Sequence, residues 1–185
     1  MKMSIQIKDC IKQLPKDVND LMEISEKIYD LGTLEEAKKK ISPALFTAHV
    51  GIQMVGMWQD DGWEGIFQNT DFLPYIPQSL DLFGTPKIKE AFLNAFSMFE
   101  GVIQFCDGDV RLYDVMDFLF SSRTVAKNEG LKKYSEEEHA QLSEEFCERL
   151  DRLENLPEND ALWGYKTPDK GWEGVLNYVK ENYNA

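Results

Sequence analysis

Apolar residues recur along most of this chain at steps of three and four, which is the period of an amphipathic helix. The clearest run follows Thr85-Pro86, a strong start signal, and its apolar stripe consists of Phe92, Phe96, Phe99, Ile103 and Cys106. A second apolar run over residues 43–59 should begin with Ser42 as N-cap and Pro43 in the first turn. Gly51 and Gly56 within this run favour close contact with a neighbouring helix.

Turn and capping signals divide the rest of the chain. Two capping boxes, Thr33-x-x-Glu36 and Ser135-x-x-Glu138, predict helix starts. Asp60-Asp61-Gly62 should end the 43–59 helix, and a short helical turn should follow before Asn69. Further helices are expected from about residue 15 to Gly32, between Pro74 and Gly84, over 110–126, over 135–153 and from Thr167-Pro168 onward. Residues 127–134 and 155–165 are expected to be irregular.

One alternative competes with the helical interpretation. Asp107-Gly108 lies between two short apolar runs, 102–105 and 110–113, and so resembles the turn of a β-hairpin. A hairpin would interrupt the helical stripe before Ile103 and Cys106, whereas a helix accounts for both. The whole pattern therefore predicts an all-α fold: one domain over residues 1–185, built as a single compact bundle of about seven or eight helices.

Composition limits the function classes. The chain has 185 residues, 43% of them hydrophobic, and a net charge of −13 from 33 acidic and 20 basic side chains. Such a charge opposes direct nucleic-acid binding and docking on an anionic membrane, since both need a positive field. No apolar run has the length of a signal peptide or membrane span, and three scattered cysteines give no disulfide framework. We expect a cytoplasmic protein; its oligomeric state stays open.

The sequence offers little catalytic chemistry. It contains no nucleophile, phosphate-loop, dinucleotide or zinc-protease motif. His49 lies in an apolar run and is expected to be a hydrogen-bonded core residue, whereas His139, among glutamates, is expected on a solvated face. Asp107-Gly108-Asp109 resembles the start of a calcium loop, but apolar residues occupy the later ligand positions, which favours a helix stop. We therefore predict no catalytic residue, cofactor or metal site.

Charge placement is more informative than charge total. Residues 135–160 contain ten acidic residues and two arginines, and residues 41–86 contain five acidic residues and no Lys or Arg. If the two regions are adjacent, they form a surface of one sign that would attract a basic protein. An acidic helix face that only keeps the protein soluble explains the same pattern. The candidate partner-binding residues are Asp60, Asp61, Glu64, Glu144, Glu145, Glu148 and Asp151.

Residues 48–100 resemble the DNA-mimic-protein-19-like family, a bacterial group also catalogued as domain of unknown function 4375. The family signature is a helix, an Asn-Gly-Gly-aromatic turn and then Gln-aromatic-aromatic-x-Asn. The corresponding run here is Asp60-Asp61-Gly62-Trp63-Glu64-Gly65-Ile66-Phe67-Gln68-Asn69, in which Gly62, Trp63, Phe67 and Asn69 match. Asp60-Asp61 replaces the usual Asn-Gly, and Gly65 stands where the family has Gln.

The resemblance implies an all-helical fold, no known catalytic activity and, for the family's namesake, a role as a DNA mimic that occupies a DNA-binding transcription factor. We expect the matching residues to hold the fold: Gly62 for a tight turn, Trp63 and Phe67 as anchors and Asn69 as a local cap. The leading hypothesis is thus a non-enzymatic acidic protein that binds a basic protein. An immunity or antitoxin protein that neutralises a basic toxin, and an enzyme with a deep pocket containing Asp60, Glu64 or His49, stay open as alternatives.

Overall fold

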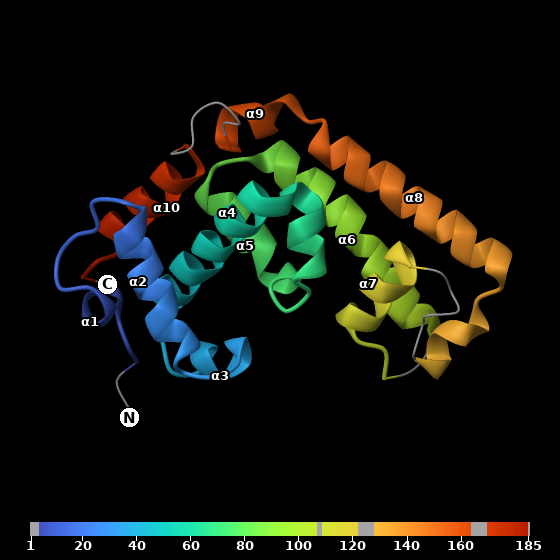
Figure 1. The fold of residues 1–185 in the computed structure, drawn as a ribbon, viewed down its shortest axis with the longest axis horizontal. Coiled ribbons are helices and arrows are strands. Elements are labelled where there is room, and N and C mark those ends of the chain that lie inside the picture. The colour runs from blue at the N-terminus through green and yellow to red at the C-terminus, as the bar shows by residue number, and fades with distance from the viewer. Residues whose placement is uncertain (1–3, 107–108, 122–127, 164–169, 185) are drawn as a thin grey trace.

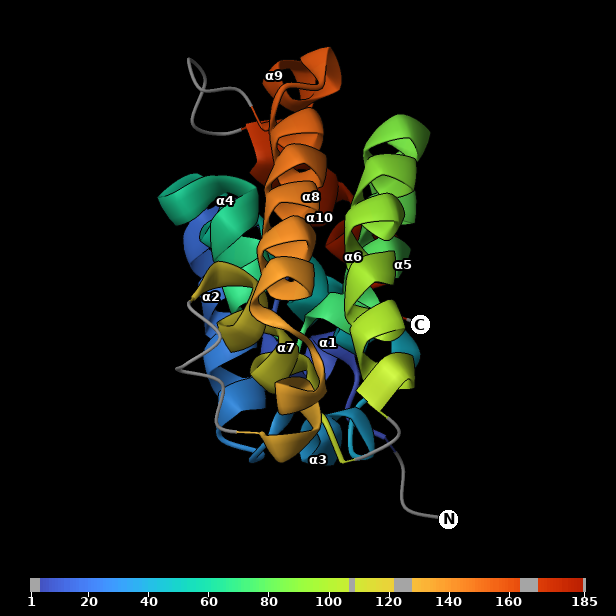
Figure 2. The same ribbon diagram turned by 90° about the vertical axis from the view of Figure 1, so that its right-hand side faces the viewer.

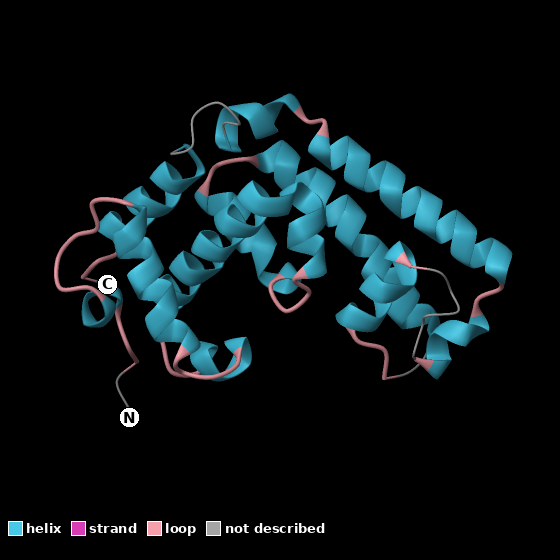
Figure 3. Cartoon of the chain, viewed as in Figure 1, coloured by secondary structure: helices cyan, strands magenta, loops and turns pink. Residues whose placement is uncertain are grey.

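The computed structural model describes residues 4–106, 109–121, 128–163 and 170–184, and Figures 1 and 3 show that helices dominate them. The predicted all-α class is confirmed. The described residues form ten α-helices and two 3-10 helices, more than the seven or eight expected: α1 (Ile7–Cys10), α2 (Val18–Tyr29), α3 (Leu34–Lys38), α4 (Pro43–Gln68), η1 (Leu73–Tyr75), α5 (Ile76–Leu82), α6 (Pro86–Cys106), α7 (Leu112–Phe120), η3 (Glu129–Lys133), α8 (Glu136–Glu154), α9 (Pro157–Trp163) and α10 (Lys170–Glu181). The sole β-type pairing in this part of the chain is an isolated parallel bridge between Ile5 and Ile41.

Local capping chemistry sets several helix starts. Both predicted capping boxes form: Thr33 Oγ1 accepts from the Glu36 N–H at 3.3 Å, and Ser135 Oγ accepts from the Glu138 N–H at 3.1 Å. Ser42 caps α4, with Pro43 in its first turn, as the sequence indicated. These groups satisfy N–H donors that a helix leaves unpaired at its start.

The centre of the fold is α4, which packs against α2, α5, α8 and α10 (Figure 1). A Cβ at Gly51 would lie 3.5 Å from Cγ2 of Val175, so this glycine faces α10 closely, as expected. Farther along α4, a cluster of rings joins three helices. The ring centroid of Phe67 lies 5.2 Å from that of Phe92 on α6 and 5.3 Å from that of Phe146 on α8. Edge and offset contacts of this kind stabilise a core beyond the area they bury.

The structure settles the choice between hairpin and helix. The run 102–105 belongs to α6, which continues to Cys106, and therefore the hairpin interpretation is wrong. Asp107-Gly108 itself lies outside the described residues. The next helix, expected over 110–126, is described as α7 and reaches its C-cap at Ser121, while 122–127 lie outside the described part.

Other expectations need correction. Residues 127–134 were expected to be a loop, but they contain η3. The side chain of Asn128 caps the start of η3, because its Oδ1 accepts from the Gly130 N–H at 2.9 Å. Residues 155–165 were expected to be irregular, but Pro157–Trp163 form α9. The predicted start at Thr167-Pro168 lies outside the described residues. Tyr29, at the end of α2, is 55% exposed, and its hydroxyl donates to Gln53 Oε1 at 2.7 Å.

Candidate interaction surface

Helix α8 carries most of the candidate partner-binding residues and runs along one side of the molecule, with α6 beside it (Figure 2). Its inner face buries Phe146, Leu150 and Leu153. At 3.6 residues per turn, an acidic row projects from the opposite side of the helix. We call this row the outer stripe; it consists of Glu137, Glu144, Glu148 and Asp151, all exposed. It extends over about 21 Å at 1.5 Å per residue.

Arginines neutralise part of this helix. Arg149 pairs with Glu145 at 2.5 Å and also donates to the Asn94 carbonyl on α6 at 2.6 Å, so Glu145 faces α6 and is no member of the outer stripe. Arg152 pairs with Glu148 at 3.3 Å. Glu144 and Asp151 form no ion pair with any described residue. Two of the four α8 candidates therefore have no cationic partner in the described part of the chain.

The other candidates lie at a kink in α4. Asp61 and Gly62 have non-helical backbone angles, and Gly62 adopts φ 62° and ψ −150°, a conformation that suits glycine. The helix is thus broken where the sequence predicted, although it resumes and continues to Gln68. Asp60, Asp61 and Glu64 are exposed around this kink.

A single carboxylate joins the kink to α8. Glu154 Oε1, at the C-terminal end of α8, accepts from the Trp63 backbone N–H at 2.6 Å. Trp63 opens the second segment of α4, whose first N–H groups lack partners within their own helix. A residue 91 positions away therefore caps this segment.

The same contact brings the two acidic regions together. Burial raises the pKa of Glu154, the nearby carboxylates of Asp151 and Glu64 add to the rise, and hydrogen bonds from the Trp63 and Glu64 N–H groups lower it. Because Glu154 on α8 bonds to the backbone of Trp63, the residue before Glu64, carboxylates from both regions meet at this end of α8. We call Asp60, Asp61, Glu64, Glu144, Glu148 and Asp151 the acidic surface.

Two of the residues that match the family motif, Trp63 and Phe67, lie beneath this surface, whereas Asn69 is exposed. Trp63 and Phe67 are fully buried. Trp63 Nε1 donates to Asn159 Oδ1 at 3.0 Å, and Trp163 Nε1 donates to the same oxygen at 3.1 Å. Asn69 Nδ2 donates to the Gly65 carbonyl at 2.7 Å, near the end of α4. Their contacts thus hold the kink in place from inside the protein.

Sequence reasoning missed two residues that matter here. Glu154 counted as one acidic side chain among ten, and Asn159 fell in a segment expected to be irregular. Asn159 also donates to the Leu153 carbonyl at 2.5 Å, which fixes the turn from α8 into α9. No local pattern pairs Glu154 or Asn159 with Trp63, because the partners are more than 90 residues apart.

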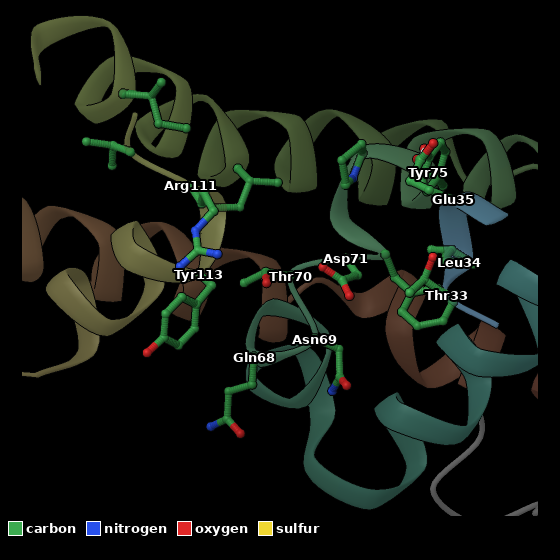
Figure 4. A pocket seen from close by; sticks show the side chains of 15 residues that line it. Thr33, Leu34, Glu35, Gln68, Asn69, Thr70, Asp71, Tyr75, Arg111 and Tyr113 are labelled. Carbon is green, nitrogen blue, oxygen red and sulfur yellow. The ribbon is translucent and has the colours of Figure 1, made fainter. Parts of the chain in front are cut away.

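Neither histidine is placed for catalysis at this surface. His49 is 1% exposed, its Nδ1 lies 2.9 Å from Ser25 Oγ, and burial lowers its pKa to about 4, in keeping with a hydrogen-bonded core residue. His139 was expected on a solvated face, but it is buried, with Nε2 2.6 Å from the Phe118 carbonyl. Figure 4 shows a cavity elsewhere in the fold, and none of Asp60, Glu64 or His49 lines it.

Within the described part of the chain, no group of three or more His, Cys, Asp or Glu side chains could hold a metal ion. Across the same residues, no helix combines the length and apolar character needed to cross a bilayer. No protein-family model, curated protein or solved structure matches the chain.

Proposed function

We propose that this protein binds a basic protein through the acidic surface and, in the manner of a DNA mimic, competes there with DNA. The observation that carries the proposal is the hydrogen bond from the Trp63 N–H to Glu154, which brings the C-terminal end of α8 to the kink where Asp60, Asp61 and Glu64 lie. The net charge of −13 adds a long-range field that attracts cationic proteins. The motif resemblance described above supports the same role.

Rigidity also supports the proposal. Carboxylates on α8 are spaced by helical geometry, with about 6 Å of rise from Glu144 to Glu148 and about 4.5 Å from Glu148 to Asp151. Duplex DNA presents one phosphate charge per strand at roughly 3.4 Å of axial rise. Neighbouring carboxylates of the outer stripe are separated by rises of about 10.5, 6 and 4.5 Å, the same order as the roughly 7 Å between every second phosphate of a strand. Because the core side of α8 is buried against α6 and α7, the backbone that carries these charges is already ordered, and only the side chains have to be ordered on binding.

The test is competition for a basic DNA-binding protein. The protein should displace labelled duplex DNA from such a partner at low salt, in a fluorescence anisotropy assay, and the displacement should weaken steeply as salt is added. Reversal of Glu144, Glu145, Glu148 and Asp151 to Lys should abolish displacement while the helical circular dichroism signal stays unchanged.

A control variant reverses exposed acids elsewhere, at Glu26 and at Asp30, the C-cap residue of α2. The control variant carries half the charge change but lies away from the acidic surface. If the α8 reversal variant still displaces DNA as well as the parent protein does, across a panel of basic DNA-binding proteins, the proposal is wrong.

A further inference from the structure

A cavity of about 920 Å³ lies between α3, the segment that follows α4 and the start of α7 (Figure 4). Its lining includes the apolar side chains of Leu34, Phe72 and Val110, and polar groups surround them. Ligand cavities in proteins commonly have volumes of roughly 300–1,000 Å³ and combine an apolar lining with a few convergent polar groups. No residue of the acidic surface lines it, so the inference below does not depend on the proposed function.

Arg111 lies at one end of this cavity, where its side chain is 74% exposed and the buried carboxylate of Asp114 lies against it. Asp114 is 8% exposed, its Oδ2 lies 3.5 Å from Arg111 Nε, and it also accepts from the Arg111 backbone N–H at 2.9 Å. The ion pair engages the Nε edge of the guanidinium, and Figure 4 shows the group directed into the cavity near Tyr113. An oriented guanidinium is suited to a carboxylate, which it can bind through two parallel hydrogen bonds. Arg111 is also the one basic side chain among the described residues that line the cavity.

Two carboxylates follow Arg111 along the cavity. Asp71 lies in the middle, and Glu35 lies at the far end beside Tyr75 (Figure 4). Asp71 is exposed, and its side chain forms no hydrogen bond or ion pair with any described residue, Arg111 included. The Glu35 carboxylate accepts from the Tyr75 hydroxyl. Lys38 Nζ donates to the same Tyr75 hydroxyl at 3.1 Å. The charges of the lining residues thus run positive, negative, negative, and the Lys38 ammonium lies beside the Glu35 end without lining the cavity.

We propose that the cavity binds a free basic amino acid. Such a ligand carries a carboxylate, an α-ammonium group and a side-chain cation in that order, which complements the order Arg111, Asp71, Glu35. The alkyl part of its side chain would lie over the apolar lining. A net positive ligand is also favoured by the field of a protein with a net charge of −13.

Isothermal titration calorimetry on the full chain tests the three contacts separately, because each has a matched ligand and variant. L-arginine is the reference, and the expected affinity is micromolar to low millimolar. Agmatine lacks only the carboxylate and should bind about tenfold more weakly, as should L-arginine to Arg111→Gln. Nα-acetyl-L-arginine lacks the α-ammonium group and is the ligand matched to the variant Asp71→Asn. L-norleucine lacks the side-chain cation and is the ligand matched to the variant Glu35→Gln.

The comparison of each ligand with its matched variant shows whether the named residue makes the proposed contact. If Arg111 binds the carboxylate, Arg111→Gln should leave the affinity for agmatine unchanged, since the contact is already absent. Arg152→Gln on α8 is the control and should bind L-arginine like the parent protein. The proposal is overturned by absence of saturable heat with L-arginine, by an equal loss of agmatine affinity in Arg111→Gln, or by L-glutamate binding as tightly as L-arginine.

Discussion

The carboxylate of Glu154 caps the helical segment that begins at Trp63, with 2.6 Å between the Trp63 backbone nitrogen and Oε1. This contact ties the end of α8 to the kink of α4 and so fixes the geometry of the acidic surface. It does so although burial and two neighbouring carboxylates raise the pKa of Glu154, which means that ionisation of this group is opposed by its surroundings. The fold therefore holds the Glu154 carboxyl near Asp151 and Glu64 although their negative charges repel one another.

Removal of that cap should destabilise the protein. Glu154→Ala leaves the partly buried Trp63 N–H without its acceptor, and we expect the free energy of unfolding to fall by about 1 to 2 kcal/mol. Urea denaturation followed by tryptophan fluorescence measures the change. Glu144→Ala, an exposed residue on the same helix, should change stability by less than about 0.5 kcal/mol. Equal effects of the two substitutions would contradict the capping role.

The glycine at the kink should resist substitution. Gly62 has a positive φ, and a Cβ added there would lie 2.7 Å from Glu154 Oε1. Gly84 also has a positive φ, of 65°, but a Cβ there would meet open space. We therefore expect Gly84→Ala to cost about 1 kcal/mol and Gly62→Ala about 3 kcal/mol. Thermal unfolding of the two variants compares them directly, and a cost for Gly62→Ala no larger than that for Gly84→Ala would refute the close packing.

Stability should fall in mild acid because of His49. Its folded-state pKa of about 4 lies below the ordinary value of 6.5, so between these values the unfolded chain binds more protons than the folded one. The folded state is thus penalised as pH falls from about 6.5 toward 4. Between about pH 7 and 5 this amounts to roughly 2 kcal/mol. The loss should shrink by that amount in His49→Gln, as measured by urea denaturation at both pH values, and an unchanged loss would show that His49 is not responsible.

The elements that sequence alone predicted are those governed by neighbouring residues. The capping boxes at Thr33 and Ser135 need partners only three positions away, and the break at Gly62 needs only a glycine after two aspartates. Burial of His139 was missed because adjacent glutamates outweighed its position seven residues before Phe146, on the core face of α8. The spacing of seven residues from Phe146 could have predicted that His139 is buried.

Features that depend on residues distant in the sequence could not be predicted from local sequence patterns. Helix α9 forms where Asn159 bonds to both Trp63 and Trp163, a tertiary arrangement that the run of polar residues in this segment does not indicate. Arg111, Asp71 and Glu35 come together only because α7, the end of α4 and α3 surround one cavity. The acidic candidates were predicted by composition, whereas their division into paired and unpaired charges required side-chain geometry.

The central claim is that uncompensated carboxylates on the acidic surface attract a basic protein. Its most direct test is the dissociation constant for a basic DNA-binding protein over a series of salt concentrations, with the parent protein and the neutral variant Glu144→Gln/Asp151→Asn. The account predicts that the variant binds at least about tenfold more weakly at low salt and depends less steeply on salt, because two unpaired charges are lost. Equal affinity and an equal salt slope for the two proteins would contradict it.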